Sequence, residues 1–187
     1  RGSRIPGGAS DRRMPLPIAL DYRPALLSSA GIGRVTRELA AALSLRGELE
    51  LHLFGHSLAR ARVAHALPRT ALLHRLPIPG RTLPTLARLG LAADRLCGSP
   101  RVFHCTDYVE LPVRRARVVL TVHDLAFAHD ASFHGEAQAA QLLARTRTAA
   151  AAAAAVVVPS RTTADDVQRL TPARRVVVVP FGSEHAQ

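Results

Sequence analysis

The sequence contains no lysine and no tryptophan, and aromatic residues make up only 4% of it. All 25 of its permanently cationic side chains are therefore arginines. The absence of lysine excludes a P-loop lysine for nucleotide phosphates and a lysine Schiff base as a covalent intermediate. Cys97 and Cys105 are too few for a disulfide framework and lack the spacing of zinc ligands, so a reducing cytoplasm is the expected compartment.

Long apolar runs are missing as well. The longest candidate, TAAAAAAAVVVPS at 148–160, falls short of the ~18 apolar residues of a membrane-spanning helix. Nothing after Met14 resembles the charged and then apolar segments of a secretory signal. These absences favour a globular cytoplasmic protein, with at most a peripheral contact at the inner face of the membrane.

The first residues, RGSRIPGGASDRR, lack apolar periodicity, and the only methionine follows them. We interpret 1–13 as vector-derived and 14–187 as one domain that starts at a native Met14. Removing 1–13 lowers the formal charge from +11 to +8. A basic surface suits nucleic acid, an anionic membrane face or a phosphorylated ligand. A codon bias towards alanine and arginine explains the charge at least as well.

Strands and helices are predicted to alternate along the chain. Alternating or continuous apolar runs predict strands, and apolar spacing of three and four predicts helices. The expected strands are 16–23, 49–56, 71–79, 101–107, 116–127, 154–160 and 174–182. The expected helices are 33–47, 84–96, 135–153 and 160–170, the last with Ser160 as its N-cap. This order predicts a doubly wound α/β domain, a mostly parallel sheet with helices on both faces.

Gly31-Ile32-Gly33, just ahead of a helix-like run, raises the possibility of a nicotinamide-dinucleotide turn. In such a turn the first glycine follows the strand almost at once, and the third position is a glycine. Here Gly31 comes nine residues after Tyr22, and the third position is Thr36. The dinucleotide hypothesis therefore fails. Two alternatives stay open: the glycines let a phosphate approach the amides of a helix N-terminus, or they only begin the helix.

Five segments resemble, in order, the N-terminal domain of retaining family-4 glycosyltransferases, closest to the mannosyltransferase-like members of the GT-B fold. The resemblance runs from Met14 to about Glu184 and implies a Rossmann-like half of that fold. The segments are AGIGRVTRELAAAL, RVFHCTDYVELP, RVVLTVHDLAF, AAVVVPSRTTADDV and RRVVVVPFGSE. The family's E-x7-E pair in the donor-binding half has no counterpart in this chain. The resemblance therefore implies that the donor-binding C-terminal domain is absent and that this domain alone is inactive.

The resemblance also implies roles for particular residues. Gly31, Ile32 and Gly33 would lie against the donor diphosphate, with Arg34 if it turns inward rather than into solvent. His123 would be the catalytic histidine that contacts the transferred sugar; the alternative is a structural histidine with Asp124 as its hydrogen-bond partner. His104, Tyr108 and Asp124 would recognise the acceptor, although His104 could simply close a strand and Asp124 could cap a helix. The CTDY turn after His104 departs from the family pattern and leaves the acceptor open.

The other histidines are expected to be ordinary core or surface residues, and no metal site is predicted. These are His52, His56, His65, His74, His129 and His134.

The implied reaction transfers a sugar from a nucleoside-diphosphate sugar, with GDP-mannose as the first candidate donor, to an acceptor hydroxyl with retained configuration. No cofactor is implied, and the acceptor is a glycan, a lipid-linked compound or a small molecule. A rival hypothesis is a stand-alone module that binds a nucleotide or phosphoryl ligand without catalysis. Nucleic-acid binding is the third hypothesis, because the arginines are spread over many elements and few aromatics are present for base stacking. SLARARV (57–63) could contact an anionic membrane.

Overall fold

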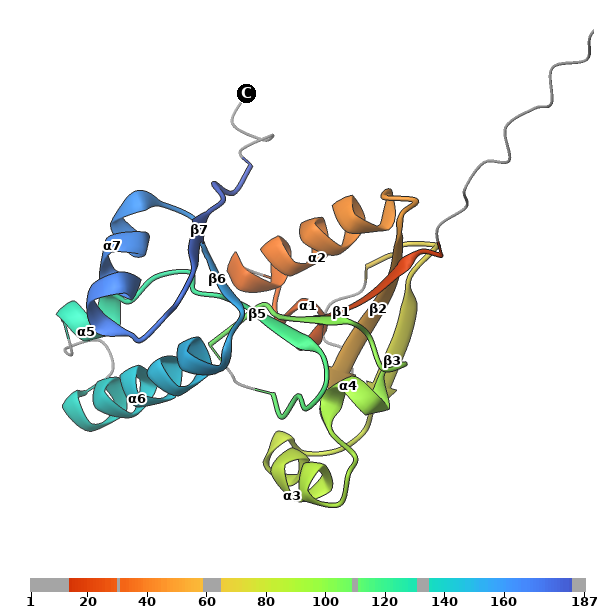
Figure 1. The fold of residues 1–187 in the computed structure, drawn as a ribbon, viewed down its shortest axis with the longest axis horizontal. Helices are drawn as coiled ribbons and strands as arrows, with labels where there is room; N and C mark the ends of the chain where they lie inside the picture. Colours follow the sequence, from red (N-terminus) through yellow and green to blue (C-terminus); the bar gives the residue numbers. More distant parts are fainter. Residues whose placement is uncertain (1–13, 30, 59–64, 109–110, 131–134, 183–187) are drawn as a thin grey trace, which may run out of the picture.

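The computed structural model describes residues 14–29, 31–58, 65–108, 111–130 and 135–182. Its centre is a seven-stranded, all-parallel sheet in the order β3-β2-β1-β4-β5-β6-β7 (Figure 1). The strands are β1 Leu16–Asp21, β2 Leu49–His56, β3 Leu72–Leu76, β4 Val102–Cys105, β5 Arg117–Thr121, β6 Ala155–Val158 and β7 Val176–Val178. The predicted α/β fold class is confirmed.

The helices connect these strands across both faces of the sheet. They are α1 Arg23–Leu27, α2 Gly31–Ser44, α3 Leu83–Arg88, α4 Ala93–Leu96, α5 Ala126–His129, α6 Glu136–Ala152 and α7 Arg161–Leu170, with a 3-10 turn, η1, at Gly80–Thr82. The Ser160 side chain accepts a hydrogen bond from the Thr163 amide at the start of α7, as predicted. The predicted helix 84–96 was wrong in extent: it is two short helices, and α1 and α5 were not predicted.

The direction in which successive strands are added to the sheet reverses at β1. From β1 the sheet grows towards β2 and β3 on one side and towards β4 to β7 on the other. Leu20, Leu51 and Leu53 pack with α1 and α2 on one face, whereas Phe54 and Phe103 belong to the core formed with α3, α4, α6 and α7 on the other. The boundary between β1 and β4 is therefore a topological switch point, where ligands of open α/β sheets bind beyond the strand ends.

The turn between α1 and α2 is held by packing and by an arginine. Arg37 donates hydrogen bonds to the carbonyl oxygens of Ala25 and Ser28 at 2.9 and 2.8 Å, and to that of Ser29 at 3.1 Å. A Cβ on Gly33 would collide with the backbone oxygen of Ser28. Gly33 is therefore required by the close approach of backbone atoms, which gives it a packing role within the protein itself.

Asp94 fastens α4 to the segment that enters β5. Its carboxylate is 2% exposed and accepts hydrogen bonds from the backbone amides of Arg95, Arg114, Arg115 and Ala116 at 2.7–3.3 Å. Burial alone would raise the pKa of Asp94, but these four amides outweigh it and lower the pKa below its ordinary value. The charged form is therefore stabilised by folding.

We expect Gly33→Ala to lower the free energy of unfolding by about 1–3 kcal/mol, because a backbone oxygen lies too close to the position of the new Cβ. Gly47→Ala is the matched control, since no atom lies within 4 Å of the position that its Cβ would take. Urea unfolding measures both. Wild-type stability in Gly33→Ala would contradict the packing role.

Replacing Asp94 by alanine should lower the free energy of unfolding by about 2–3 kcal/mol at neutral pH, because buried amides lose their partner. The folded-state pKa is depressed, so the carboxylate stabilises the fold above 3.8, its ordinary pKa, and this stabilisation is lost as the pH falls below that value. The difference between variant and wild type should therefore shrink in acid. Asp165→Ala, at an exposed position of α7, is the control and should change stability by less than about 0.5 kcal/mol.

Candidate functional site

His123 lies two residues beyond the end of β5 and is partly buried. Its Nε2 donates a hydrogen bond to the backbone oxygen of Thr106 at 2.9 Å. Because a carbonyl oxygen can only accept, Nε2 carries a proton, and in the neutral ring the lone pair resides on Nδ1. The fold thus fixes which nitrogen of His123 can accept a hydrogen bond from a ligand.

Aromatic rings flank this imidazole. Tyr108 meets it edge-on with ring centroids 6.5 Å apart, and Phe181, which follows β7, lies at 5.4 Å. Phe127 of α5 packs edge-on against Tyr108 at 6.0 Å. Burial, with smaller effects of the Asp124 and Asp107 charges, raises the pKa of Tyr108 to about 12. The phenol therefore stays protonated and can donate a hydrogen bond near neutral pH.

His104 lies beside this group on β4. Its Nε2 is 2.7 Å from Oγ1 of Thr121 on the adjacent strand. Burial lowers the pKa of His104 to about 4, and the nearby His123 contributes to the same shift. His104 is therefore uncharged at neutral pH, and its hydrogen bond with Thr121 ties β4 to β5.

Asp124 is exposed, and its Oδ1 accepts a hydrogen bond from the Ala126 amide at 3.0 Å. This is a local turn that starts α5, in line with the helix-capping alternative. The structure thus brings His123, Tyr108 and His104 into one group, whereas the Asp124 carboxylate accepts a hydrogen bond from the backbone two residues further on.

The predicted diphosphate residues form the first turn of α2. Gly31 has φ +42° with open space above its Cα, and both Gly31 and Arg34 are exposed. Within the part of the chain that the structure describes, no hydrogen bond, ion pair or ring contact joins this turn to His123. The turn is a separate element of the candidate site, and the role of Gly31, Ile32, Gly33 and Arg34 stays a prediction.

A second polar group at the switch point was not predicted. Asp21 ends β1 with no exposed surface, and its Oδ1 accepts a hydrogen bond from the Arg23 amide at 3.1 Å. The Arg23 guanidinium is 3.6 Å from Asp21 Oδ2 and donates to Asp107 Oδ2 at 3.1 Å. The Thr106 hydroxyl donates to the Asp21 backbone oxygen at 2.7 Å. Burial raises the pKa of Asp21 to about 6, although the Arg23 charge opposes the shift.

His56 ends β2 next to this group and is 4% exposed. Burial lowers its pKa to about 4, and the charge of Arg23 contributes to the same shift. Gly80 packs on the ring, where a Cβ would lie 2.9 Å from Cε1 of His56. We call Asp21, Arg23, His56 and Asp107 the switch-point cluster.

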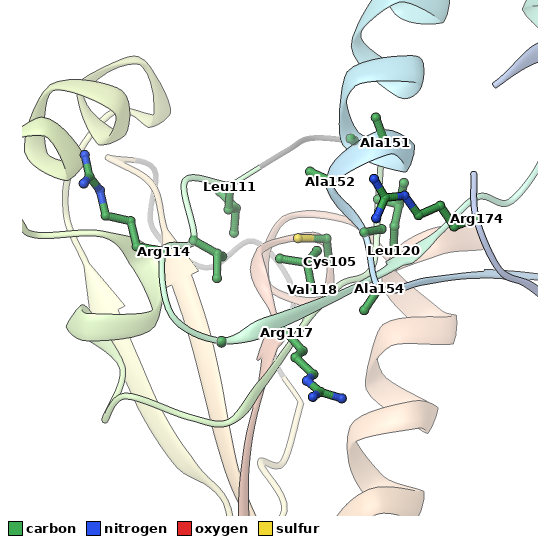
Figure 2. Close-up of a pocket in the computed structure, with 14 residues that line it drawn as sticks. Cys105, Leu111, Arg114, Arg117, Val118, Leu120, Ala151, Ala152, Ala154 and Arg174 are labelled. Atoms are coloured by element: carbon green, nitrogen blue, oxygen red, sulfur yellow. The ribbon is translucent and has the colours of Figure 1, made fainter. Parts of the chain in front are cut away.

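A cavity of about 520 Å³ lies elsewhere, under the end of α6 and near the starts of β5 and β6 (Figure 2). Its lining is mostly alanine, valine and leucine, with Cys105 of β4 and three arginines. In Figure 2 the guanidinium groups of Arg114 and Arg117 extend away from the middle of the lining residues. None of the predicted site residues lines this cavity, and it offers no group suited to the implied reaction.

Among the described residues, no three His, Cys, Asp or Glu side chains are placed together as a metal site. None of the described helices is both long and apolar enough to span a bilayer. The arginine-rich part of SLARARV, like His134, lies outside the described residues. Cys97 and Cys105 are buried and form no disulfide.

Known proteins are similar to this chain in sequence and in structure. A protein-family model described as Glycosyltransferase Family 4 matches residues 29–186. Sucrose-phosphate synthase from Thermosynechococcus elongatus is similar in structure, with a TM-score of 0.67 and 19% identity over 90% of this chain and 48% of that one. A second structure of that enzyme gives a TM-score of 0.51 and 16% identity over 90% of both chains. No curated protein matches the sequence.

The sequence identity to the synthase structures is below 20%, so the structural similarity supports the fold alone. This chain spans about half the length of the first synthase structure. The family match, in contrast, covers well over half of this chain. The resemblance to the family is confirmed, whereas the comparisons say nothing of a mannosyltransferase. The chain belongs to glycosyltransferase family 4.

Proposed function

We propose that this chain is the acceptor-side half of a retaining glycosyltransferase that moves a sugar from a nucleoside-diphosphate sugar to an acceptor hydroxyl. Family membership supports the reaction class. The observation that carries the proposal is the orientation of His123 beyond the end of a central strand. Its Nε2 donates to the Thr106 carbonyl, which leaves Nδ1 of His123 as the acceptor nitrogen.

In the reaction, the bond between the anomeric carbon and the diphosphate oxygen breaks while a bond from that carbon to the acceptor oxygen forms on the same face. The proton of the acceptor hydroxyl passes to the leaving diphosphate. His123 Nδ1 accepts a hydrogen bond from a hydroxyl of the transferred sugar and thereby holds the sugar ring in place. Positioning of this kind supplies much of the rate enhancement of a two-substrate reaction.

The leaving diphosphate requires positive partners. The first turn of α2 has amide groups without intrahelical acceptors, and the helix dipole adds to their attraction for an anion. Gly31 leaves space above this turn, and exposed Arg34 is on the same turn. We assign the diphosphate to this turn, where it would be stabilised as its charge increases in the transition state.

We further propose that a second domain supplies the nucleotide site. The similar synthase structure is about twice as long as the matched part, and no pair of glutamates in this chain has the E-x7-E spacing. The intact mass of the gene product that contains this chain tests this directly. A donor panel that includes GDP-mannose and UDP-glucose then tests the mannosyltransferase hypothesis.

We expect that intact gene product to transfer sugar with retained configuration, and His123→Ala to reduce kcat by at least about 100-fold, because an interaction with the reacting sugar is lost. His129→Ala is the matched control, since that side chain is 49% exposed and pairs with Asp166 on α7. NMR of the product gives the anomeric configuration, and initial rates give kcat.

Two outcomes would contradict the proposal in different ways. Transfer at a nearly unchanged rate in His123→Ala would remove His123 from the site while leaving the reaction intact. Nucleotide binding without transfer to any acceptor would instead favour the stand-alone binding module.

A further inference from the structure

The switch-point cluster contains buried polar atoms without a hydrogen-bond partner in the described structure, although the Arg23 guanidinium lies 3.6 Å from Asp21 Oδ2. These atoms are Oδ2 of Asp21 and both ring nitrogens of His56. Leaving such atoms unsatisfied is costly, and folded proteins rarely do so without a ligand or a water. Three such atoms in one cluster therefore indicate that a ligand or a water binds there.

The two side chains lie on the same face of neighbouring strands. Asp21 of β1 is in register with Phe54 of β2, and His56 is two residues further along β2, so it points to the same side as Phe54. Both residues stand at the carboxyl ends of their strands beside the switch point. Arg23 and Asp107, whose side chains are 18% and 20% exposed, connect this buried pair to solvent.

The chemistry of the cluster selects a neutral, hydroxyl-bearing ligand. A carboxylate oxygen accepts hydrogen bonds, and a neutral imidazole donates with one nitrogen and accepts with the other. Hydroxyl groups can donate to Asp21 and both donate to and accept from His56. The carboxylates of Asp21 and Asp107 would repel an anion, and the Arg23 guanidinium would repel a metal ion. A compound with adjacent hydroxyls could use Arg23 and Asp107 as well.

We propose that the switch-point cluster is a hydroxyl-binding subsite that recognises a polyhydroxylated acceptor, a sugar or a polyol. Calling the ligand an acceptor rests on the proposed function, whereas the binding of hydroxyl compounds does not. The subsite lies on the α3 side of the sheet, whereas His104, Thr121 and His123 lie on the α2 side by strand alternation. The acceptor thus reaches across the switch point towards His123.

The first test uses the 187-residue chain alone. Its histidine ring nitrogens are followed by NMR while D-mannose, D-glucose or glycerol is added up to high-millimolar concentrations. We expect the His56 signals to shift in a saturable way with at least one sugar. Half-saturation of the His56 signals should need about tenfold more sugar in Asp21→Asn, because a hydrogen bond to a buried polar group is lost.

His52→Gln is the matched control, because His52 is a second buried histidine on the same strand and the same face, 5% exposed and bonded to His74. It should bind as the wild type does. Unchanged His56 signals with all three compounds would mean a buried water only and would overturn the proposal. The wild-type titration decides this even if one of the variants fails to fold.

The second test uses the intact gene product. Asp21→Asn should raise the acceptor KM about tenfold with little change in the donor KM. An unchanged acceptor KM in an active enzyme would overturn the subsite while leaving the proposed function intact. Saturable sugar binding by a product that transfers no sugar would instead contradict the proposed function and keep the subsite.

Discussion

The order in which strands are added to the sheet reverses at β1, and this reversal is the constraint on which the rest of the structure depends. Parallel strands require crossover connections of one hand, so helices that lead to opposite sides of β1 must cover opposite faces. α1 and α2 therefore lie on one face and α3, α4, α6 and α7 on the other (Figure 1). The end of β1 is left between two diverging layers, and there Asp21, Arg23, Thr106 and Asp107 come together.

Two buried aspartates show how differently the fold treats one kind of side chain. Asp94 receives four backbone amides, and its pKa is lowered despite burial. Asp21 receives one amide at 3.1 Å and a guanidinium at 3.6 Å, and burial raises its pKa to about 6. Asp94 is satisfied by the protein itself and so has a structural role. Asp21 is left short of partners, as expected of a group that is completed by a ligand.

Much of the fold was predictable because the signals were local. Continuous valine runs and long alanine-rich segments placed α6 and most strands to within four residues, whereas the predicted strand 116–127 was wrong in extent, since β5 ends at Thr121 and α5 begins at Ala126. The helix predicted at 84–96 is interrupted because Gly90, at φ +84°, ends α3 with a hydrogen bond from Leu91 to Leu86. α1 and α5, of five and four residues, are too short to show helical periodicity. The position of His123 beyond the end of a strand could be predicted from the apolar run before it, whereas its catalytic role rests on the likeness to the family and stays a prediction.

The switch-point cluster could not be predicted in the same way, because it depends on the register between two separate strands and on the burial of His56. That cluster and the His123 group share one property. Arg23 faces two carboxylates, those of Asp107 and Asp21, while His56 and His104 are neutral at pH 7 and the Tyr108 phenol is protonated. Such an edge offers hydrogen bonds without an excess of positive charge, which suits hydroxyl groups better than phosphates. In the proposed enzyme the diphosphate must therefore find its positive partners elsewhere, and the first turn of α2 with Arg34 is where this chain offers them.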